Sequence, residues 1–295
     1  MAKRKRKNKK SLLLSFVVII LLLLGIGVEK DGGIDTNPYS ASDAYVHFID
    51  VGQGSSTLIQ IGDKGILIDA GEKEYGDYVV EYIDSCGIKE LEYVIASHPH
   101  SDHIGGMTDV IEECKIGEFI MPELTEINIP TTKVYERMIS ALLERDVDVT
   151  AAKVGDSFIT EGITMKILGP YEQTEDLNDM SVICKATVNG VDFMILGDAE
   201  KGELSSVYNN VNAGYESDVI AMGHHGSSTS IYKSFLNAVN ADTAVISCGK
   251  DNSYGHPHKE ALQYIKNNGM TLYRTDYDGD VVFRCAGGEY ERVDY

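Results

Sequence analysis

The stretch SHPHSDHIGGM at residues 97–107 directly follows an apolar segment that is predicted to be a strand. Its polar side chains therefore leave the edge of a sheet on one loop. In extended backbone, positions i and i+2 point the same way, so the rings of His98 and His100 can converge on one cation. Asp102 and His103, past the turn, can serve a neighbouring cation. Imidazole nitrogens with one carboxylate suit zinc, so the pattern favours a metal centre over a solvated histidine-rich loop.

The order of the segments around this loop predicts two sheets. Short β-rich runs and amphipathic helical patterns alternate from residue 44 to residue 285, with turn residues between them. Asn189-Gly190 separates the β-rich runs 181–188 and 191–196 and is the strongest hairpin signal in the chain. Each half of the chain starts with strands and continues with helices and strands in alternation. This order predicts an α/β fold in which two mixed sheets face each other with helices outside.

Six further motifs each fall at the end of a predicted strand. They are HFIDVGQGSSTLI at 47–59, ILIDAG at 66–71, NDMSV at 178–182, MILGDAE at 194–200, HHGSSTS at 224–230 and YGHPH at 254–258. With the H-x-H-x-D-H pattern of the loop, they resemble the metallo-β-lactamase superfamily and, within it, the soluble metallo-hydrolase domain of the ComEC family of competence proteins. The resemblance covers residues 44–285 and implies an αββα sandwich and hydrolysis assisted by two metal ions.

The resemblance also assigns metal ligands in the second half of the chain. It implies that Asp198 bridges the two ions and that one histidine of the pair His224-His225 completes the second site. We favour His225 as the ligand, in which case His224 hydrogen-bonds substrate or solvent. The chemistry agrees, because the two oxygens of a carboxylate can span cations about 3.5 to 4 Å apart. The alternative role for Asp198 is to cap the helix that starts near Glu200.

One position departs from the pattern of many superfamily members, which supply a further histidine between the first motif and the bridging aspartate. The chain has no histidine between His103 and His224. ComEC-like sequences have an Asn-x-x-Ser element there, matched by Asn178 and Ser181, and we place Asn178 among the substrate-binding residues. An amide oxygen is a harder ligand than imidazole, so the first site would be loosely held or accept manganese. We expect two divalent ions, with zinc favoured and manganese as the alternative.

Two aspartates are candidates to support the metal ligands from behind. Asp50 and Asp69 end adjacent predicted strands, where each carboxylate can accept the other ring N–H of a metal-binding histidine. The competing role for both residues is to cap a turn.

Polar residues near the end of the chain are candidates for contact with substrate. His256 and His258 flank a proline in a loop before a helix, where either can hold a phosphate oxygen or protonate a leaving group. Ser227 lies in a serine-rich turn and can bind phosphate or cap a helix. We assign leaving-group assistance to His256 or His224, and we count Asp102 with them as catalytic.

The N-terminal region predicts a membrane anchor. Residues 1–10 are strongly basic, and residues 11–28 carry no charge and are long enough to span a bilayer. Because lysine and arginine are retained on the cytoplasmic side, the span would be single-pass with the catalytic domain outside the cell. Residues 29–43 form a polar tether and residues 44–295 the hydrolase domain. The alternative is a cleaved signal peptide and a secreted protein.

Composition limits the partners and the redox chemistry. The chain carries a net charge of −20, and seven of its 26 basic residues lie in the first ten, so the remainder is more acidic still. A field of that sign repels nucleic acid and argues against indiscriminate polyelectrolyte binding. The five cysteines are odd in number and form no C-x-x-C pair. They indicate either one optional disulfide or surroundings that do not oxidise thiols.

We expect a metal-dependent hydrolase in which an activated water attacks phosphorus. The family resemblance favours phosphodiester substrates, either nucleic acid or a cell-envelope polymer such as a decorated teichoic acid. Two other classes stay open. One is hydrolysis of β-lactams or other amides and esters on the same fold, and the other is a non-catalytic surface binding module in DNA uptake. No feature of the sequence indicates a protein partner.

Overall fold

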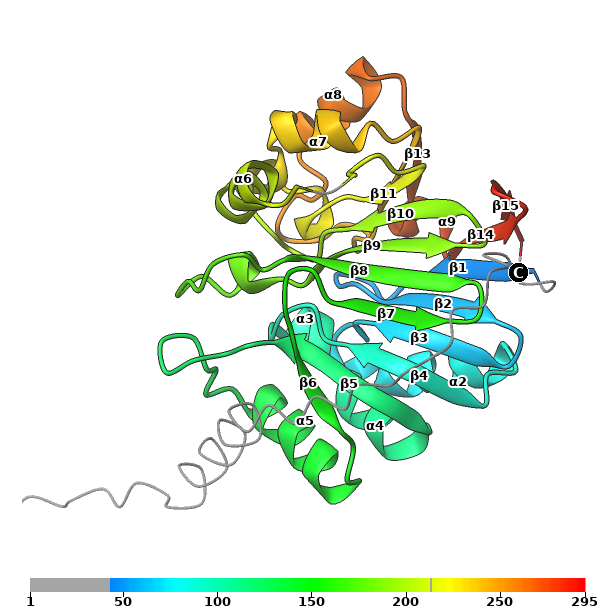
Figure 1. The fold of residues 1–295 in the computed structure, drawn as a ribbon, viewed down its shortest axis with the longest axis vertical. Helices are drawn as coiled ribbons and strands as arrows, with labels where there is room; N and C mark the ends of the chain where they lie inside the picture. The colour runs from blue at the N-terminus through cyan, green and yellow to red at the C-terminus, as the bar shows by residue number, and fades with distance from the viewer. Residues whose placement is uncertain (1–42, 213, 295) are drawn as a thin grey trace, which may run out of the picture.

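Two β-sheets that face each other form the centre of the protein in the computed structural model, which describes residues 43–212 and 214–294 (Figure 1). The first sheet has the strand order β15-β14-β1-β2-β3-β4-β5-β6 and the second has the order β13-β12-β11-β10-β9-β8-β7. The strands of the first sheet are β1 (Ala44–Phe48), β2 (Thr57–Ile61), β3 (Lys64–Ile68), β4 (Glu90–Ile95), β5 (Ile116–Pro122), β6 (Val149–Ala152), β14 (Val281–Ala286) and β15 (Glu289–Val293). Those of the second are β7 (Ser157–Thr160), β8 (Ile163–Gly169), β9 (Ile183–Val188), β10 (Val191–Ile195), β11 (Val219–Ala221), β12 (Thr243–Ile246) and β13 (Thr271–Arg274).

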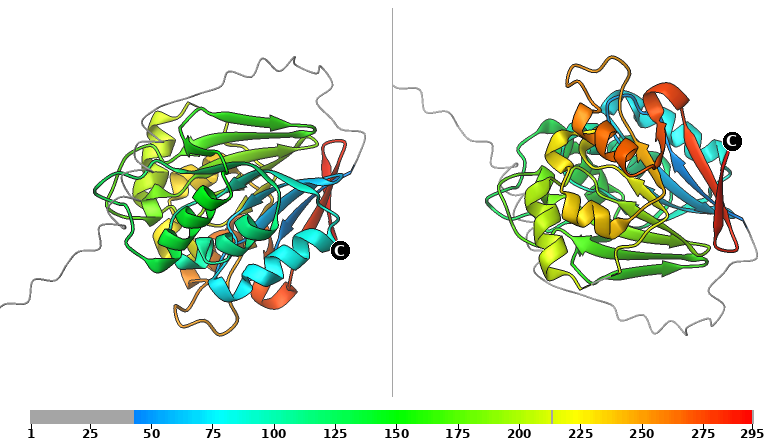
Figure 2. Two further views of the ribbon diagram at one scale, coloured as in Figure 1. Left: turned by 90° about the horizontal axis from the view of Figure 1, so that it is seen from below. Right: turned by 90° about the horizontal axis from the view of Figure 1, so that it is seen from above.

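Helices cover the outer face of each sheet (Figure 2). The first sheet packs against α2 (Gly76–Ser85), α4 (Met107–Glu113) and α5 (Lys133–Glu144). The second packs against α6 (Lys201–Asn210), α7 (Lys233–Val239) and α8 (Lys259–Asn267). Shorter helical turns connect these elements: η1 (Lys73–Tyr75), α3 (Ser101–Ile104), η2 (Asn178–Met180), η3 (His224–Gly226), η4 (Ser228–Ser230) and α9 (Thr275–Asp278). The predicted sandwich of two sheets with helices outside is confirmed.

Alternating side chains in the strands produce this layered core. In β10, Val191, Phe193 and Ile195 point between the two sheets, whereas Met194 points outward into the cluster formed with α6, α7 and α8. The period of two in a strand places successive side chains on opposite faces, and both faces of this sheet are covered. Because both faces of β10 are covered, almost every position in the strand is apolar.

The predicted hairpin is present between β9 and β10. Asn189 and Gly190 have φ values of 48° and 88°, which are the left-handed conformations that a two-residue type I′ turn needs. The antiparallel register pairs Val188 with Val191 directly across the turn. The hairpin thus fixes the position of β10, whose carboxyl end leads to Asp198.

The C-terminal strands depart from the expected division into two sequential halves. β14 returns to the first sheet and pairs antiparallel with β1, with Phe48 opposite Val281, and β15 adds to the edge beyond it. The alternation predicted up to residue 285 does not indicate which sheet β14 joins, and it does not predict β15 or α9. Partner choice between strands depends on contacts far apart in sequence, which periodicity does not report.

The predictions for residues 1–10 and 11–28 lie outside the described residues, as does the predicted tether at residues 29–43 except for its last residue. Within the described part of the chain, no helix combines the length and apolar character that a membrane span needs. All five cysteines have free thiols, and four of them are buried.

Candidate metal centre

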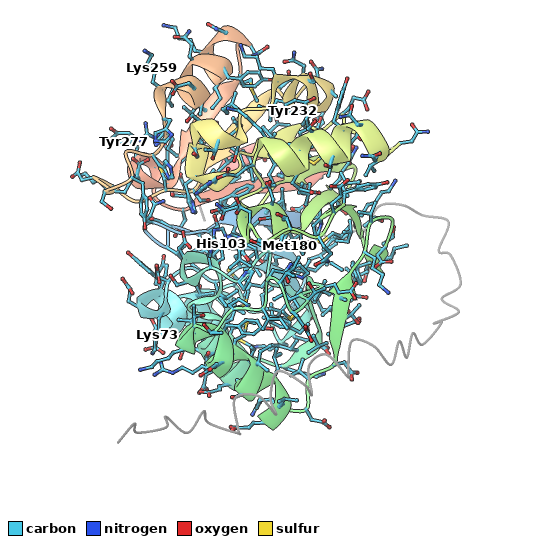
Figure 3. The ribbon with its side chains drawn as sticks, turned by 90° about the vertical axis from the view of Figure 1, so that its left-hand side faces the viewer. Lys73, His103, Met180, Tyr232, Lys259 and Tyr277 are labelled. Atoms are coloured by element: carbon cyan, nitrogen blue, oxygen red, sulfur yellow. The ribbon has the colours of Figure 1, made fainter. Side chains whose placement is uncertain are left out.

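Loops from both sheets meet at the carboxyl ends of the strands. β3 and β4 run parallel to each other, as do β10, β11 and β12, so their carboxyl ends lie on the same side of the sandwich. The labelled His103 and Met180 lie midway between the two halves of the molecule (Figure 3). The polar residues that these loops carry are Asp69 after β3, residues 97–103 after β4, Asp198 after β10, His224 and His225 after β11 and Ser247 after β12.

The glycine pair in the first motif permits close packing of this loop. A Cβ at Gly105 would lie 2.3 Å from the backbone nitrogen of Lys73, and one at Gly106 would lie 2.4 Å from the carbonyl oxygen of Ala70. Both distances are shorter than any side chain allows, so only glycine fits. The close approach brings the short helix α3, which carries Asp102 and His103, against the loop that follows β3.

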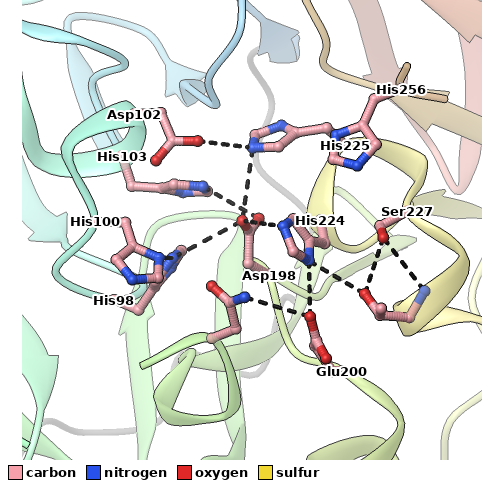
Figure 4. A network of polar contacts seen from close by, with 12 residues as sticks. His98, His100, Asp102, His103, Asp198, Glu200, His224, His225, Ser227 and His256 are labelled. Carbon is pink, nitrogen blue, oxygen red and sulfur yellow. Dashed lines mark hydrogen bonds and ion pairs between the residues drawn. The ribbon is translucent and has the colours of Figure 1, made fainter. Parts of the chain in front are cut away.

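Four side chains form a compact set of metal-ligand atoms. One atom from each of Asp102, His103, Asp198 and His225 lies within 4.8 Å of the others (Figure 4). His225 Nε2 is 3.2 Å from Asp102 Oδ2 and 3.6 Å from Asp198 Oδ2, and His103 Nε2 is 3.1 Å from Asp198 Oδ1. His103, Asp198 and His225 are buried. These four residues are the set that the sequence assigned to the second metal ion.

The partners behind His103 determine which of its nitrogens faces the centre. Its Nδ1 lies 2.7 Å from Asp69 Oδ2, and the amide and hydroxyl of Ser97 also donate to the Asp69 carboxylate, at 2.7 Å each. An ionised carboxylate only accepts hydrogen bonds, so Nδ1 of His103 carries the proton. Nε2 of the neutral ring then presents a lone pair toward Asp198. Asp69 therefore lies in the supporting position predicted for it.

His225 is oriented in the same way by a backbone carbonyl. Its Nδ1 donates to the carbonyl oxygen of Ser247 over 2.9 Å, which leaves Nε2 facing the carboxylates of Asp102 and Asp198. Lone pairs thus face carboxylate oxygens across the centre. Among the described residues, His103 Nε2 and Asp198 Oδ1 are buried without a hydrogen-bond partner. A cation between such acceptors satisfies them all, so the residues fit a divalent metal ion.

The charges of the site point to the same conclusion. Burial alone would lower the pKa of His103, but the carboxylates of Asp198 and Asp69 outweigh burial and raise the pKa well above its usual value. Burial would likewise raise the pKa of Asp198, yet the rings of His103 and His225 hold it well below its usual value. The pocket thus favours positive charge, which protons supply when no metal ion is bound. Metal binding must displace those protons and should weaken at low pH.

A second set of donors lies on the other side of Asp198. His98 Nδ1 is 3.1 Å from the hydroxyl oxygen of Ser97, whose own proton goes to Asp69. Nε2 of His98 therefore faces His100 Nδ1 at 3.0 Å and Asp198 Oδ2 at 3.9 Å. Burial and the neighbouring His103 lower the pKa of His98 well below its usual value, so the ring stays neutral and able to bind a metal. His98 and His100 are thus placed to bind the first ion predicted from the sequence.

The Asn-x-x-Ser element supports this side of the centre with both of its polar side chains. The hydroxyl of Ser181 accepts a hydrogen bond from the backbone amide of Asp198 at 3.0 Å and so anchors that residue. Asn178 donates its Nδ2 to Glu200 Oε1 at 3.4 Å, while its Oδ1 is buried without a hydrogen-bond partner in the described chain. A buried amide oxygen without a partner is available to bind a cation or a substrate donor.

His224 and His225 share an uncommon backbone conformation. Their φ values are 51° and 54°, in the left-handed region that residues with a side chain rarely adopt. Such a residue costs of order 1–3 kcal/mol and persists only where its surroundings hold it. The backbone amide of His224 donates to Gly197 O at 3.1 Å, which ties this turn to the loop of Asp198. The turn directs His225 to the metal-ligand cluster and His224 Nε2 to 3.7 Å from Asp198 Oδ2.

His256 lies beside these histidines, with its ring centroid 5.4 Å from that of His224 (Figure 4). The sequence predicts a substrate contact for the neighbouring His258. Its Nδ1 accepts from the amide of Ser228 at 3.0 Å, and its Nε2 lies 3.3 Å from the carbonyl oxygen of Tyr254. Both ring nitrogens thus contact backbone groups of neighbouring loops, and substrate binding by His258 stays a prediction.

Two other candidates have contacts that match the alternative roles given for them. Ser227 accepts from the amide of Thr229 at 3.3 Å and caps the turn η4, and phosphate binding by Ser227 stays a prediction. Asp50 accepts from the amide of Gly52 at 3.1 Å, which is turn capping, and its described hydrogen bonds include none to a histidine ring. The residue after a strand end can support either its own turn or a neighbouring loop, and here the turn is closer.

Several residues of the centre were not identified from the sequence. Glu200, within the motif MILGDAE, contacts His224 and Asn178, and Gln53, within the GQG turn, lies 3.5 Å from His256. Both residues stand inside motifs quoted above, so a position within such a motif indicates a residue near the centre. The carbonyl of Ser247 gives no signal, because any residue supplies that atom.

The fold and the centre together define a class. The protein is an αββα sandwich with a candidate metal-binding cluster where the carboxyl ends of its strands meet. A family model of the metallo-beta-lactamase superfamily matches residues 49–250, and the chain belongs to this superfamily.

The more specific resemblance to ComEC-like competence proteins is also confirmed. The chain is 29% identical over 269 residues to ComE operon protein 3 of Bacillus subtilis, covering 84% of this chain and 34% of that protein. It is 29% identical to competence protein ComA of Neisseria gonorrhoeae, covering 84% of this chain and 33% of that one. With recombination protein 2 of Haemophilus influenzae, the identity is 28%, covering 80% and 28% respectively. The chain thus spans about a third of the length of these relatives.

Two solved structures show the same fold at low identity. The diiron β-hydroxylase CmlA of Streptomyces venezuelae has a TM-score of 0.54 at 11% identity, covering 86% of this chain and 55% of CmlA. The metallo-beta-lactamase fold protein YhfI of Bacillus subtilis has a TM-score of 0.53 at 14% identity, covering 82% of this chain and 99% of YhfI. Because these likenesses show the fold alone, the site must indicate the chemistry.

Proposed function

We propose that this protein is a hydrolase with two metal ions that cleaves phosphodiesters. The observation that carries the proposal is the set of metal-ligand atoms around Asp198, in which histidine nitrogens and carboxylate oxygens converge and in which His103 Nε2 and Asp198 Oδ1 are buried without a hydrogen-bond partner among the described residues. Such a set is costly to bury unless it binds a cation. Zinc is the favoured ion, because most of the donor groups are imidazoles. Manganese is the alternative.

Each ligand has a defined part in this proposal. His98 and His100 would hold one ion, Asp102, His103 and His225 the other, and the Asp198 carboxylate would span the two. When bound, the ions would supply an activated water and neutralise charge that develops on oxygen. The protein itself orients the ligands through their second ring nitrogens and keeps most of them buried from bulk water.

Phosphodiesters are the proposed substrates because the centre offers several polar groups around one point. His224 and His256 lie beside the cluster, and neither is among the residues assigned above to hold the metals. Phosphoryl transfer spreads charge over several oxygens, whereas opening a β-lactam needs stabilisation of one carbonyl oxyanion. The relative named recombination protein 2 favours nucleic acid over a cell-envelope polymer. β-lactam or other ester and amide hydrolysis, and metal-loaded binding without turnover in DNA uptake, are the alternatives.

A substrate panel tests the reaction class. We expect the metal-loaded protein to cleave a bis-aryl phosphodiester and single-stranded oligonucleotides more efficiently than any β-lactam or phosphomonoester, as measured by kcat/KM with zinc and manganese varied. A preference for β-lactams would replace the phosphodiester assignment. Binding of two metal ions without turnover of any substrate would support the binding module instead.

We further propose that the catalytic domain lies outside the cell and is held at the membrane by residues 11–28. The support is the basic segment at residues 1–10 followed by an uncharged apolar stretch. Protease added to intact cells should remove the domain. Full protection until the cells are lysed would contradict the orientation, and release of a shortened soluble form would show that the segment is cleaved.

A further inference from the structure

Glu200 connects the two polar side chains that flank the bridging aspartate. A single oxygen, Oε1, lies 3.1 Å from His224 Nδ1 and 3.4 Å from Asn178 Nδ2 (Figure 4). His224 comes from η3 and Asn178 from η2, so Glu200 joins turns that follow different strands of the second sheet. The residue stands two positions after Asp198, at the start of α6.

The backbone of Glu200 is itself fixed in place. Its amide donates to Asp179 Oδ1 at 2.8 Å, and its carbonyl accepts from the amide of Leu204 in the first turn of α6. The side chain is only one-quarter exposed. The carboxylate is thus held by the helix, by η2 and by His224, so it serves as a fixed acceptor.

A fixed carboxylate determines the orientation of both neighbours. It accepts hydrogen bonds only, so His224 Nδ1 must carry a proton, and Nε2 is the nitrogen that faces Asp198. Thr229 Oγ1 also lies 3.3 Å from Nδ1, but a hydroxyl can donate or accept and so does not by itself fix the tautomer. The same logic applies to Asn178. Turning its amide by 180° would bring Oδ1 against the Glu200 carboxylate, where two acceptors repel. Nδ2 therefore stays on Glu200, and Oδ1 stays as the buried oxygen without a partner.

We propose that Glu200 is a positioning residue that sets the His224 tautomer and the Asn178 amide orientation together. Through it, His224 presents an imidazole nitrogen to Asp198, and Asn178 keeps a buried amide oxygen without a partner among the described residues, in the part of the chain where many superfamily members have a third histidine. The expected effect on catalysis rests on the proposed phosphodiesterase function. The effect on His224 and on metal affinity does not.

Three variants of the full chain test this role. Glu200→Ala removes both hydrogen bonds. Glu200→Gln keeps a carbonyl oxygen that can accept both of them in one rotamer. Glu216→Gln, an exposed position in the same half of the molecule, controls for the loss of one negative charge. The measurements are the tautomer of His224 by imidazole ¹⁵N NMR on the metal-free protein, manganese and zinc affinity by titration, and kcat and KM on a bis-aryl phosphodiester.

We expect Glu200→Ala to mix the His224 tautomers, to weaken binding of one metal ion and to lower kcat by about 10- to 100-fold with little change in KM, the range typical for partners of site residues. Glu200→Gln should retain the wild-type His224 tautomer and most of kcat. Glu216→Gln should retain the wild-type tautomer and the full kcat. An unchanged tautomer in Glu200→Ala, or a Glu200→Gln variant as impaired as Glu200→Ala, would overturn the proposal. If the wild type cleaves no phosphodiester but the tautomer still shifts in Glu200→Ala, the positioning role stands and the proposed function fails.

Discussion

Replacing Asp198 with alanine should release both metal ions and lower phosphodiester hydrolysis by at least about 10³-fold, the upper range for the loss of a single electrostatic group in an active site. The carboxylate lies 3.1 Å from His103 Nε2, 3.6 Å from His225 Nε2 and 3.9 Å from His98 Nε2. Because the carboxylate contacts ligands of both proposed metal ions, its removal should weaken the binding of both ions. The two sheets pack through apolar side chains elsewhere, so the protein should remain folded.

Elemental analysis, far-ultraviolet circular dichroism and kcat/KM measure these outcomes. Two asparagine variants provide a graded comparison. Asp69→Asn alters the hydrogen-bond acceptor of His103 Nδ1. It should lower the affinity for the second metal ion by about 10- to 100-fold, which is typical when the partner of a metal ligand is changed. Asp50→Asn alters a turn-capping carboxylate of similar position in the sequence and should leave metal content unchanged. Normal metal content in Asp198→Ala, or equal losses in Asp69→Asn and Asp50→Asn, would contradict the assignment.

Local patterns were sufficient to predict much of this architecture. β4 is largely apolar, and the run that follows it is rich in histidine. In the structure, the polar side chains of that run enter the metal centre where the strand ends. The Asn189-Gly190 turn has the two positive φ values that its sequence predicts. In both cases the determining interaction lies within a few residues of the signal, which is why sequence alone reports it.

Long-range contacts account for what was missed. β14 pairs with β1 across more than 200 residues, and His258 accepts from the amide of Ser228. A histidine beside a catalytic loop has the same local sequence whether its ring turns inward or outward. The carbonyl of Ser247 orients His225 with an atom that every residue has. Only the three-dimensional arrangement of the loops distinguishes such roles.

His256 should contribute to catalysis as a neutral hydrogen-bond donor, not as an imidazolium acid. Burial and the imidazoles of His225 and His224 lower its pKa to about 4, so the ring is uncharged at neutral pH. Gln53 accepts from the amide of Gly249 with its oxygen at 3.1 Å, which turns its Nε2 toward His256 Nδ1 at 3.5 Å. With Nδ1 as the acceptor, the proton of the neutral ring is on Nε2. That N–H can donate to a phosphoryl or leaving oxygen.

His256→Ala should therefore lower kcat by about 10²-fold, a typical loss for one hydrogen-bond donor to an oxygen that gains charge, with both metal ions still bound. His256→Gln should recover part of that loss, because a side-chain amide also donates a hydrogen bond. The ratio of wild-type to His256→Ala kcat should stay constant between about pH 6 and pH 9, since a group with a pKa near 4 does not change charge in that range. A ratio that falls as the pH rises through 6 to 7, with no recovery in His256→Gln, would identify an imidazolium acid. Full activity of His256→Ala would remove the residue from the reaction altogether.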